Sequence, residues 1–468
     1  MRTSVRRIAL ALAALMALSG VWLTWASAAA GRSYRSDPRN ARTNEGAFVS
    51  GAGRIITADG VVVAEDAPNG ARRYPFEDRY AHLIGYAAES GRRGIEESRF
   101  AALRLRSDPS ITDWLLGLGS AGGRMPDDVV LTILDPLQSA AQRGLGSDTG
   151  AVVLIDLSTG AVLAYASSPS YDPNRVVAGS LDPEEAVEEL LDRVADRVLP
   201  PGSTFKILVA AAALEAGADP TTAFPDAAEY LAPDAGSPIG NAGGGFCNDG
   251  DDLTLALALT VSCNTVFARL AVTLGGSAVV TAARTAGFDA AIPWETGAVR
   301  SSVGSATLLA SDPGALAQTG IGERDVRVTP LLMALIAAAV GNDGVAMRPY
   351  VVDRIDTADG VTVRRTPPTS LARMFSAGIA TQLFEMMRAV VTDGTGGGAA
   401  VDGLVVAGKT GTAEGSGGPH AWFVGVAGED EPEVAIAVLV ESAGSGGRVA
   451  APIARQVFEA WLELRAES

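Results

Sequence analysis

Short apolar or alternating runs, each bounded by turn residues, occur in two separate parts of the chain. The earlier runs are Val129–Ile133, Ala151–Asp156 and Ala161–Ala166. The later runs are Leu404–Ala407, Ala421–Ala427 and Glu433–Val440. Their composition predicts strands, and the turn Ser158-Thr159-Gly160 joins two of them as a hairpin. Strands at both ends of one region predict a single antiparallel sheet that the two parts of the chain complete together.

Helical patterns occupy the chain beside and between these strands. Asp135–Leu145 is predicted to be a helix, and so is most of the sequence from about residue 180 to residue 400. An amphipathic helix over Ile453–Leu464 follows the last strand. The predicted architecture is therefore α+β, an antiparallel sheet with a helical subdomain inserted between its strands.

The segment 31–127 is rich in Arg and Gly and only weakly periodic. It contains one clear hairpin, Arg54–Thr57 and Val61–Ala64, around the turn Ala58-Asp59-Gly60. This pattern predicts a small pedestal domain. The glycine-rich run Gly117–Pro126 predicts its boundary, so a larger domain is expected over residues 128–468.

The first residues of the chain have the pattern of a membrane segment. Residues 8–30 carry no charge, which is enough length to span a bilayer, and Arg2, Arg6 and Arg7 precede them. The arginines place residues 1–7 in the cytoplasm, so the rest of the chain is exported. A cleaved signal peptide is the alternative, because Ala26-Ser27-Ala28 offers a small-residue cleavage site. The length of the uncharged run favours an uncleaved, single-pass anchor in the cell membrane.

Composition excludes two classes of function. The net charge of −17 and isoelectric point near 4.7 argue against a nucleic-acid-binding protein, because phosphates require a basic surface. Two cysteines and two histidines cannot build a Cys/His zinc cluster without carboxylates, and the chain has no H-E-x-x-H motif. We therefore expect no metal and no cofactor.

Lysine is almost absent, which draws attention to the two positions that keep it. Of the 37 basic residues only Lys206 and Lys409 are lysines. Arginine can replace an exposed positive charge, but it cannot replace an amine that must lose its proton. Ser203 precedes Lys206 by three positions at the start of a predicted helix, so the hydroxyl and the amine share one face. Burial and the helix dipole would favour a neutral Lys206 that activates Ser203 as a nucleophile.

Three short motifs together point to one chemistry. They are Ser203-Thr204-Phe205-Lys206, Ser262-Cys263-Asn264 and Lys409-Thr410-Gly411-Thr412. Each is weak alone, because a serine at a helix start or a K-T-G turn is common. Together they contain both lysines of the chain and match the S-x-x-K, S-x-N and K-T-G trio of penicillin-binding proteins and serine β-lactamases. His420 could serve Ser203 as a triad base, but Lys206 already supplies that base.

Beyond these motifs the sequence resembles a class B penicillin-binding protein, a membrane-anchored peptidoglycan D,D-transpeptidase, and is most similar to the short penicillin-binding protein A type. Supporting stretches are Gly150–Asp156, Ala166–Asn174, Val328–Ala334, Gly408–Glu414 and Trp422-Phe423. Two segments depart from the family pattern. Gly320–Asp325 reads Gly-Ile-Gly-Glu-Arg-Asp where a Gly-Gln-Gly form is expected, and Thr132–Gln138 has its aspartate one place late. The resemblance implies the penicillin-binding fold over residues 128–468 and a dimerisation-like pedestal over residues 31–127.

The resemblance also implies roles for the motif residues. Ser203 would attack the penultimate D-Ala carbonyl with Lys206 as its base, and Ser262 would relay a proton to the leaving D-Ala. Asn264 would orient Lys206 and the substrate amide. The substrate carboxylate would be held by Lys409, Thr410, Gly411 and Thr412. The backbone N–H groups of Ser203 and Thr412 would form the oxyanion hole.

The implied partners are stem peptides that end in D-Ala-D-Ala, β-lactams that acylate Ser203, and a RodA/FtsW-type glycosyltransferase, because no polymerising domain is apparent before residue 128. A D,D-carboxypeptidase or β-lactam hydrolase would use the same serine with water as acceptor. A non-catalytic scaffold of the wall machinery is a third hypothesis, although the intact motifs argue against it.

The two cysteines form the last predicted feature. Cys247 and Cys263 lie in the exported part of the chain, where thiols oxidise. A disulfide between them would tie the glycine-rich loop Gly243–Cys247 to the S-x-N motif, whereas two buried free thiols are the alternative.

Overall fold

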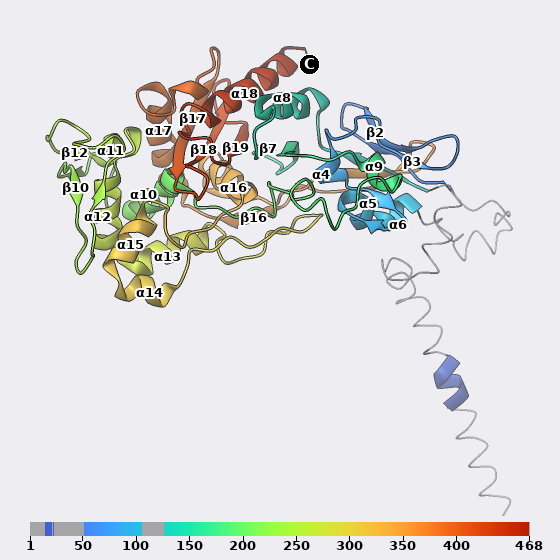
Figure 1. Cartoon of the computed structure of the whole chain (residues 1–468), viewed down its shortest axis with the longest axis horizontal. Helices are drawn as coiled ribbons and strands as arrows, with labels where there is room; N and C mark the ends of the chain where they lie inside the picture. The colour runs from blue at the N-terminus through green and yellow to red at the C-terminus, as the bar shows by residue number, and fades with distance from the viewer. Residues whose placement is uncertain (1–14, 21, 23–50, 105–125, 468) are drawn as a thin grey trace, which may run out of the picture.

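The computed structural model describes residues 15–20, 22, 51–104 and 126–467 (Figure 1). The predicted cytoplasmic segment 1–7, most of the predicted span 8–30 and most of the predicted boundary Gly117–Pro126 lie outside these residues. Residues 15–20 and 22 are helical. Among the described residues no single helix is long and apolar enough to cross a membrane.

A five-stranded antiparallel sheet organises the larger part of the molecule. Its order is β17-β18-β19-β7-β8. The central strand β19 therefore lies between β18, from the C-terminal part of the chain, and β7, from the earlier part. The strands are β7 (Gly150–Asp156), β8 (Val162–Ser168), β17 (Val405–Ala413), β18 (His420–Gly428) and β19 (Val434–Val440). The prediction that the two parts of the chain complete one sheet is confirmed.

Helices cover both faces of this sheet. α8 (Asp135–Leu145) and α18 (Ala450–Glu467) pack on one face, and α16 (Pro330–Gly341) packs on the other (Figure 1). Because successive strand residues point to opposite faces, Phe423 lies in the core under α18 while its neighbour Trp422 lies in the core with α16. Both faces are therefore buried, which explains why these strands read as nearly continuous apolar runs.

A helical subdomain lies between β8 and β17 in the sequence. Its helices are α10 (Lys206–Glu215), α11 (Leu255–Thr260), α12 (Asn264–Leu274), α13 (Gly276–Thr285), α14 (Ala306–Ser311), α15 (Pro313–Gly320) and α17 (Ala377–Thr392). Short 3-10 turns occur at Gly202–Phe205 and Gly397–Ala399. The region also contains strands that the sequence did not predict, namely β9 (Ala223–Phe224), β10 (Glu229–Tyr230), β11 (Ile239–Gly240), β12 (Leu253–Thr254), β13 (Val345–Met347), β14 (Val352–Asp356), β15 (Thr362–Arg365) and β16 (Ser370–Arg373).

A second sheet joins the N-terminal segment to the rest of the chain. Its order is β15-β14-β6-β1-β2-β3, with β1 (Ile55–Ile56), β2 (Val62–Asp66), β3 (Arg72–Arg73) and β6 (Asp128–Leu131). The predicted hairpin is confirmed as β1 and β2. β6 pairs with both β1 and β14, so this sheet contains strands from both sides of residue 128.

Small helices and polar contacts complete the N-terminal part. They are α4 (Ala81–Ile84), α5 (Gly94–Ser98), α6 (Phe100–Arg104) and α9 (Pro173–Val177), with the hairpin β4 (Ala87–Ala88) and β5 (Gly91–Arg92). The Asn174 side chain bonds both backbone groups of Tyr74, accepting at 3.0 Å and donating at 2.9 Å. Buried Arg72 donates to Glu96 at 2.5 Å. These pairings satisfy polar groups that would otherwise be buried alone.

Candidate active site

Ser203 lies on a tight turn directly before α10. The 3-10 turn Gly202–Phe205 leads into the helix, whose first residue is Lys206. Gly202 has φ +51°, and a Cβ there would lie 2.5 Å from the carbonyl oxygen of Thr412 on β17. Only glycine permits this close approach. The turn therefore holds the half-buried Ser203 beside the edge strand of the sheet.

Ser262 and Asn264 lie at the junction of α11 and α12. Ser262 has φ +62°, a left-handed conformation that is strained for a residue with a side chain. The N–H of Cys263 donates to the Ala258 carbonyl at 2.8 Å and helps to hold this junction. Asn264 is the first residue of α12. Strain of this kind persists where surrounding contacts fix a functional geometry.

The amine of Lys206 joins the first two motifs. Its Nζ donates to the backbone carbonyl of Ser262 and to Oδ1 of Asn264, each at 2.7 Å, and lies 3.3 Å from Oγ of Ser262. Lys206 is fully buried. No hydrogen bond joins Ser203 Oγ to Lys206 among the described residues, although catalytic contacts often tighten only with substrate.

The third motif lies within a strand. The sequence placed Lys409–Thr412 after a strand that ends at Ala407, but β17 runs through the motif to Ala413 because Lys409 and its neighbours pair in register with β18. That prediction was wrong about the end of the strand. Lys409 is fully buried, and its Nζ donates to Oγ of Ser262 at 2.9 Å and to the Thr410 carbonyl at 3.0 Å.

Burial dominates the electrostatics of the two lysines. Desolvation holds the pKa of Lys206 well below that of an ordinary lysine, and the nearby charge of Lys409 lowers it further. Desolvation lowers the pKa of Lys409 to about 7. A positive charge on Lys409 therefore disfavours a second positive charge on Lys206. Both effects favour the neutral amine of Lys206, which is the form that a general base requires.

The remaining K-T-G residues have unequal surroundings. Thr410 is buried, and its hydroxyl lies 2.6 Å from the hydroxyl of Thr395. Gly411 faces the turn that carries Ser203, and a Cβ at Gly411 would lie 2.6 Å from the Pro201 carbonyl oxygen. Thr412 is exposed. Thr412 is thus open to a ligand, whereas Thr410 is occupied with Thr395, a partner that no sequence pattern indicated.

Other contacts support the site. Nε1 of Trp422 on β18 donates to the Pro200 carbonyl at 2.9 Å and so fixes the turn that carries Ser203. His420 is also on β18, where its Nδ1 accepts the N–H of Ser442 at 3.1 Å. His420 has no hydrogen bond to Ser203 among the described residues, so the triad alternative gains no support from the structure.

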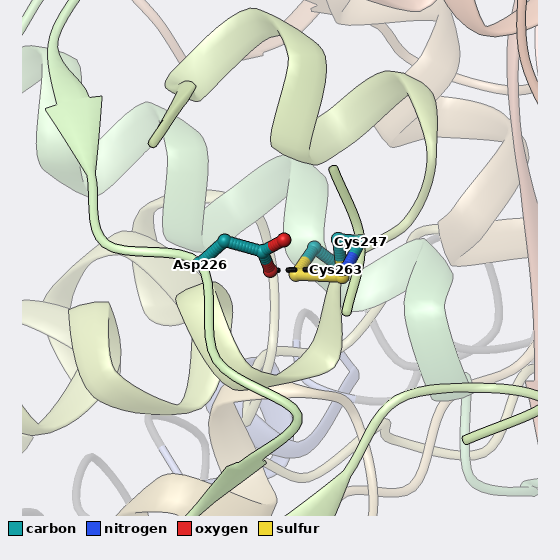
Figure 2. A group of neighbouring side chains, drawn as sticks. All are labelled: Asp226, Cys247 and Cys263. Carbon is teal, nitrogen blue, oxygen red and sulfur yellow. Dashed lines mark hydrogen bonds between the residues drawn. A yellow bond between two sulfur atoms is a disulfide. The ribbon is translucent and has the colours of Figure 1, made fainter. Parts of the chain in front are cut away.

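A disulfide joins Cys247 to Cys263 and ties the glycine-rich loop to the S-x-N motif. Figure 2 shows the carboxylate of Asp226 beside this disulfide, and the ligand atoms of the three residues lie within 4.8 Å of one another. Disulfide sulfurs cannot supply the thiolate that a metal site requires. Asp226 instead accepts the N–H groups of Cys247, Asn248 and Gly250. This cluster therefore holds a loop, not a cation.

The fold and these motifs define a class of protein. A five-stranded antiparallel sheet whose edge strand carries K-T-G, beside S-x-x-K at a helix start and S-x-N between helices, is the arrangement of penicillin-binding proteins and serine β-lactamases. A sequence profile of the family described as penicillin-binding protein transpeptidase domain matches residues 150–459. The chain belongs to this family of penicillin-binding protein transpeptidases.

Named relatives extend the similarity over nearly the full chain. The chain is 35% identical to the peptidoglycan D,D-transpeptidase PbpA of Mycolicibacterium smegmatis over 99% of both chains. It is 33% identical to PbpA of Mycobacterium tuberculosis, again over 99% of both. The crystal structure of PBPA from M. tuberculosis superposes with a TM-score of 0.81 at 34% identity, covering 89% of this chain and 100% of that one. A ceftriaxone acyl-enzyme complex of that protein has a TM-score of 0.81 at 32% identity, covering 88% of this chain and 98% of that one.

Proposed function

We propose that this protein is a peptidoglycan D,D-transpeptidase that cross-links stem peptides ending in D-Ala-D-Ala through an acyl-enzyme on Ser203. The observation that carries the proposal is the convergence of both lysine amines on one hydroxyl, Oγ of Ser262, beside the Ser203 turn. This arrangement supplies a neutral base, a relay and a cation within one buried cluster.

In the first half-reaction Lys206 removes the proton from Oγ of Ser203, and Oγ bonds to the carbonyl carbon of the penultimate D-Ala. The carbonyl π electrons move onto oxygen, which the N–H groups of Ser203 and Thr412 stabilise. Collapse of the intermediate breaks the bond to the terminal D-Ala nitrogen. That nitrogen takes its proton from Lys206 through the hydroxyl of Ser262, and D-Ala leaves.

In the second half-reaction an amine of a neighbouring stem peptide replaces D-Ala. It loses a proton along the same path, attacks the ester carbonyl, and frees Oγ of Ser203, which regains its proton. Lys409 and Thr412 hold the carboxylate of the donor peptide, with Gly411 permitting close approach. The contact between Thr410 and Thr395 favours a supporting role for Thr410.

The domain organisation belongs to the same proposal. Residues 31–127 form a pedestal, although β6, β14 and β15 of the following domain add strands to its sheet. Residues 128–468 form the transpeptidase domain. Residues 8–30 anchor the protein in the cell membrane, residues 1–7 remain cytoplasmic, and a RodA/FtsW-type glycosyltransferase supplies the sugar chains.

Labelled penicillin tests this function. The intact protein should form a long-lived acyl adduct that mass spectrometry assigns to Ser203, and Ser203→Ala should form none. With a D-Ala-D-Ala peptide and an acceptor amine, release of D-Ala should accompany formation of a new amide. Rapid loss of the penicillin label would indicate a hydrolase, release of D-Ala without a new amide would indicate a carboxypeptidase, and absence of labelling would indicate a scaffold.

A further inference from the structure

The segment Gly320–Asp325, which departs from the expected family pattern, lies against the active site. The carbonyl oxygen of Gly322 accepts the N–H of Gly202 at 3.0 Å, immediately before the nucleophile. Gly322 has φ +79°, and a Cβ there would lie 1.9 Å from the carbonyl oxygen of Gly202. The two backbones are thus in direct contact.

The side chain of the next residue, Glu323, contacts the chain just after the end of β17. Its Oε1 accepts the backbone N–H of Glu414 at 3.1 Å, one residue after β17 ends and two residues after Thr412. Gly202 also lies close to Thr412, since a Cβ at Gly202 would be 2.5 Å from the Thr412 carbonyl oxygen, and these neighbours therefore form a ring. The ring runs through Glu323, Gly322, Gly202, Thr412 and Glu414.

We propose that Glu323 is a positioning residue for acylation, because its carboxylate holds the end of β17 against the nucleophile turn. The inference rests on the proposed function. Ser203 follows Gly202, and its N–H and that of Thr412 are the two donors assigned to the oxyanion hole. Their separation depends on how the turn and the strand are held together, and Glu323 supplies the side-chain contact that closes the ring. Misplacement of such donors slows acyl transfer.

The surroundings of Glu323 make this contact sensitive to pH. Burial is the main cause that raises the pKa of Glu323 to about 7; the N–H of Glu414 opposes this, and the Glu414 carboxylate adds to it. Arg327, two residues after this segment, lowers the pKa of Glu323, but its guanidinium donates to the carbonyls of Arg324 and Val326. The turn Gly202–Phe205 brings no charged side chain to this side. An ionised carboxylate accepts an N–H roughly twice as strongly as a neutral group, so the contact is strongest above neutral pH.

Three variants of the full-length protein in detergent separate the possible outcomes. The measurement is the second-order rate of Ser203 acylation by labelled penicillin between pH 5 and pH 9. Glu323→Ala loses the acceptor and should acylate ~10-fold more slowly, since the donors remain but are less well aligned. Glu323→Gln keeps a neutral acceptor, so it should fold and acylate. The ratio of wild-type rate to Glu323→Gln rate should rise with pH around a midpoint near 7, because both proteins retain the ionisations of the lysines.

Glu414→Ala is the matched control, because Glu414 contributes only its backbone N–H to the contact. Removing its charge makes Glu323 easier to ionise. The rate ratio of Glu414→Ala to Glu323→Gln should therefore rise around a lower pH than the wild-type ratio does, and reach the same plateau at alkaline pH. A flat ratio across the pH range, wild-type acylation by Glu323→Ala, or an unmoved midpoint in Glu414→Ala would overturn the inference. If the wild-type protein is not acylated at all, the proposed function itself fails instead.

Discussion

The amine of Lys206 lies 2.7 Å from Oδ1 of Asn264, 58 positions later in the chain. A neutral amine has two N–H donors and one lone pair. Its two N–H donors are satisfied by Oδ1 of Asn264 and by the carbonyl oxygen of Ser262. Both oxygens are acceptors only, so neither can donate a hydrogen bond to the amine. The lone pair is therefore left for a hydroxyl proton, which is the geometry that a general base requires.

Replacing that amide by a carboxylate should inactivate the enzyme with little change in shape. In Asn264→Asp the new negative charge beside Lys206 raises the pKa of the amine, so the base is protonated at neutral pH. The rate of penicillin acylation should fall ~10²-fold at pH 7 and recover partly as pH rises. Asn264→Ala is the control, because it removes one acceptor without adding charge. An equal pH profile in both variants would contradict the argument.

Arginine substitutions should affect the two lysines unequally. Arginine keeps its proton at any working pH, so Lys206→Arg should lower the acylation rate at least ~10²-fold. Lys409→Arg preserves a positive charge and should retain a measurable fraction of the rate, whereas Lys409→Ala should not. If Lys206→Arg falls no further than Lys409→Arg, Lys206 is not the base. The burial of both side chains makes thermal melting of each variant the necessary control.

Stability should depend on pH through Lys409. Its pKa is about 7 in the folded protein and about 10.4 when unfolded. Between these values the unfolded chain binds a proton that the folded chain does not, so the free energy of unfolding rises with pH by about 1.4 kcal/mol per unit. Lys409→Met lacks this contribution. Urea unfolding at pH 7, 8 and 9 should show the wild-type protein gaining stability over Lys409→Met, and parallel curves would refute the low pKa.

Much of the sheet could be predicted from sequence, since its strands are apolar on both faces and local signals bound them. The helix Asp135–Leu145 was also predicted with its observed bounds, where Pro136 suits the first turn and Gly146 the end. Strand β14 was missed because it is stabilised by pairing with β6, far away in sequence, and β15 was missed because it is an exposed edge strand that pairs, among the described residues, only with β14. The predicted strand ended too early, at Ala407, because Gly and Lys have low strand propensity. Gly408 and Lys409 belong to β17 because they pair with β18.

The sequence indicated the site more completely than it indicated the contacts that support the site. Ser203, Lys206, Ser262, Asn264 and Lys409 stand in motifs with recognisable spacing. Thr395 and Glu323 do not, because each makes one contact with a residue far away in sequence, on β17 or just after it. Such contacts leave no periodicity and require the folded chain to be seen.

Loss of the disulfide should destabilise the protein. Cys247 and Cys263 close a loop with a sequence separation of 16, and a loop of this size is worth about 3 kcal/mol on the chain-entropy model. Cys247→Ser should lower the melting temperature, and reductant should lower that of the wild-type protein but not that of the variant. Labelling of the unreduced, denatured wild-type protein by a thiol reagent would argue that the bond is absent in solution.

The predicted anchor makes a separate prediction. If residues 8–30 remain attached, the mature protein should fractionate with membranes and require detergent for release, because an uncharged segment of this length is stable in a bilayer. A variant that begins at residue 31 and is exported by another signal should be recovered without detergent. A mature N-terminus at Ala29 would show instead that the segment is a cleaved signal peptide.

The strand order of the five-stranded sheet determines how much of the chain must be made before the active site can form. β7 pairs with β19, and β17 reaches β7 only through β18 and β19. During synthesis the nucleophile turn is made long before Val440, so the early part of the chain carries Ser203 without the strand that completes its site. Non-local pairing of this kind is slow and leaves strand edges exposed meanwhile. A chain that stops before β19 should therefore lack a complete active site, because β17 joins β7 only through β18 and β19.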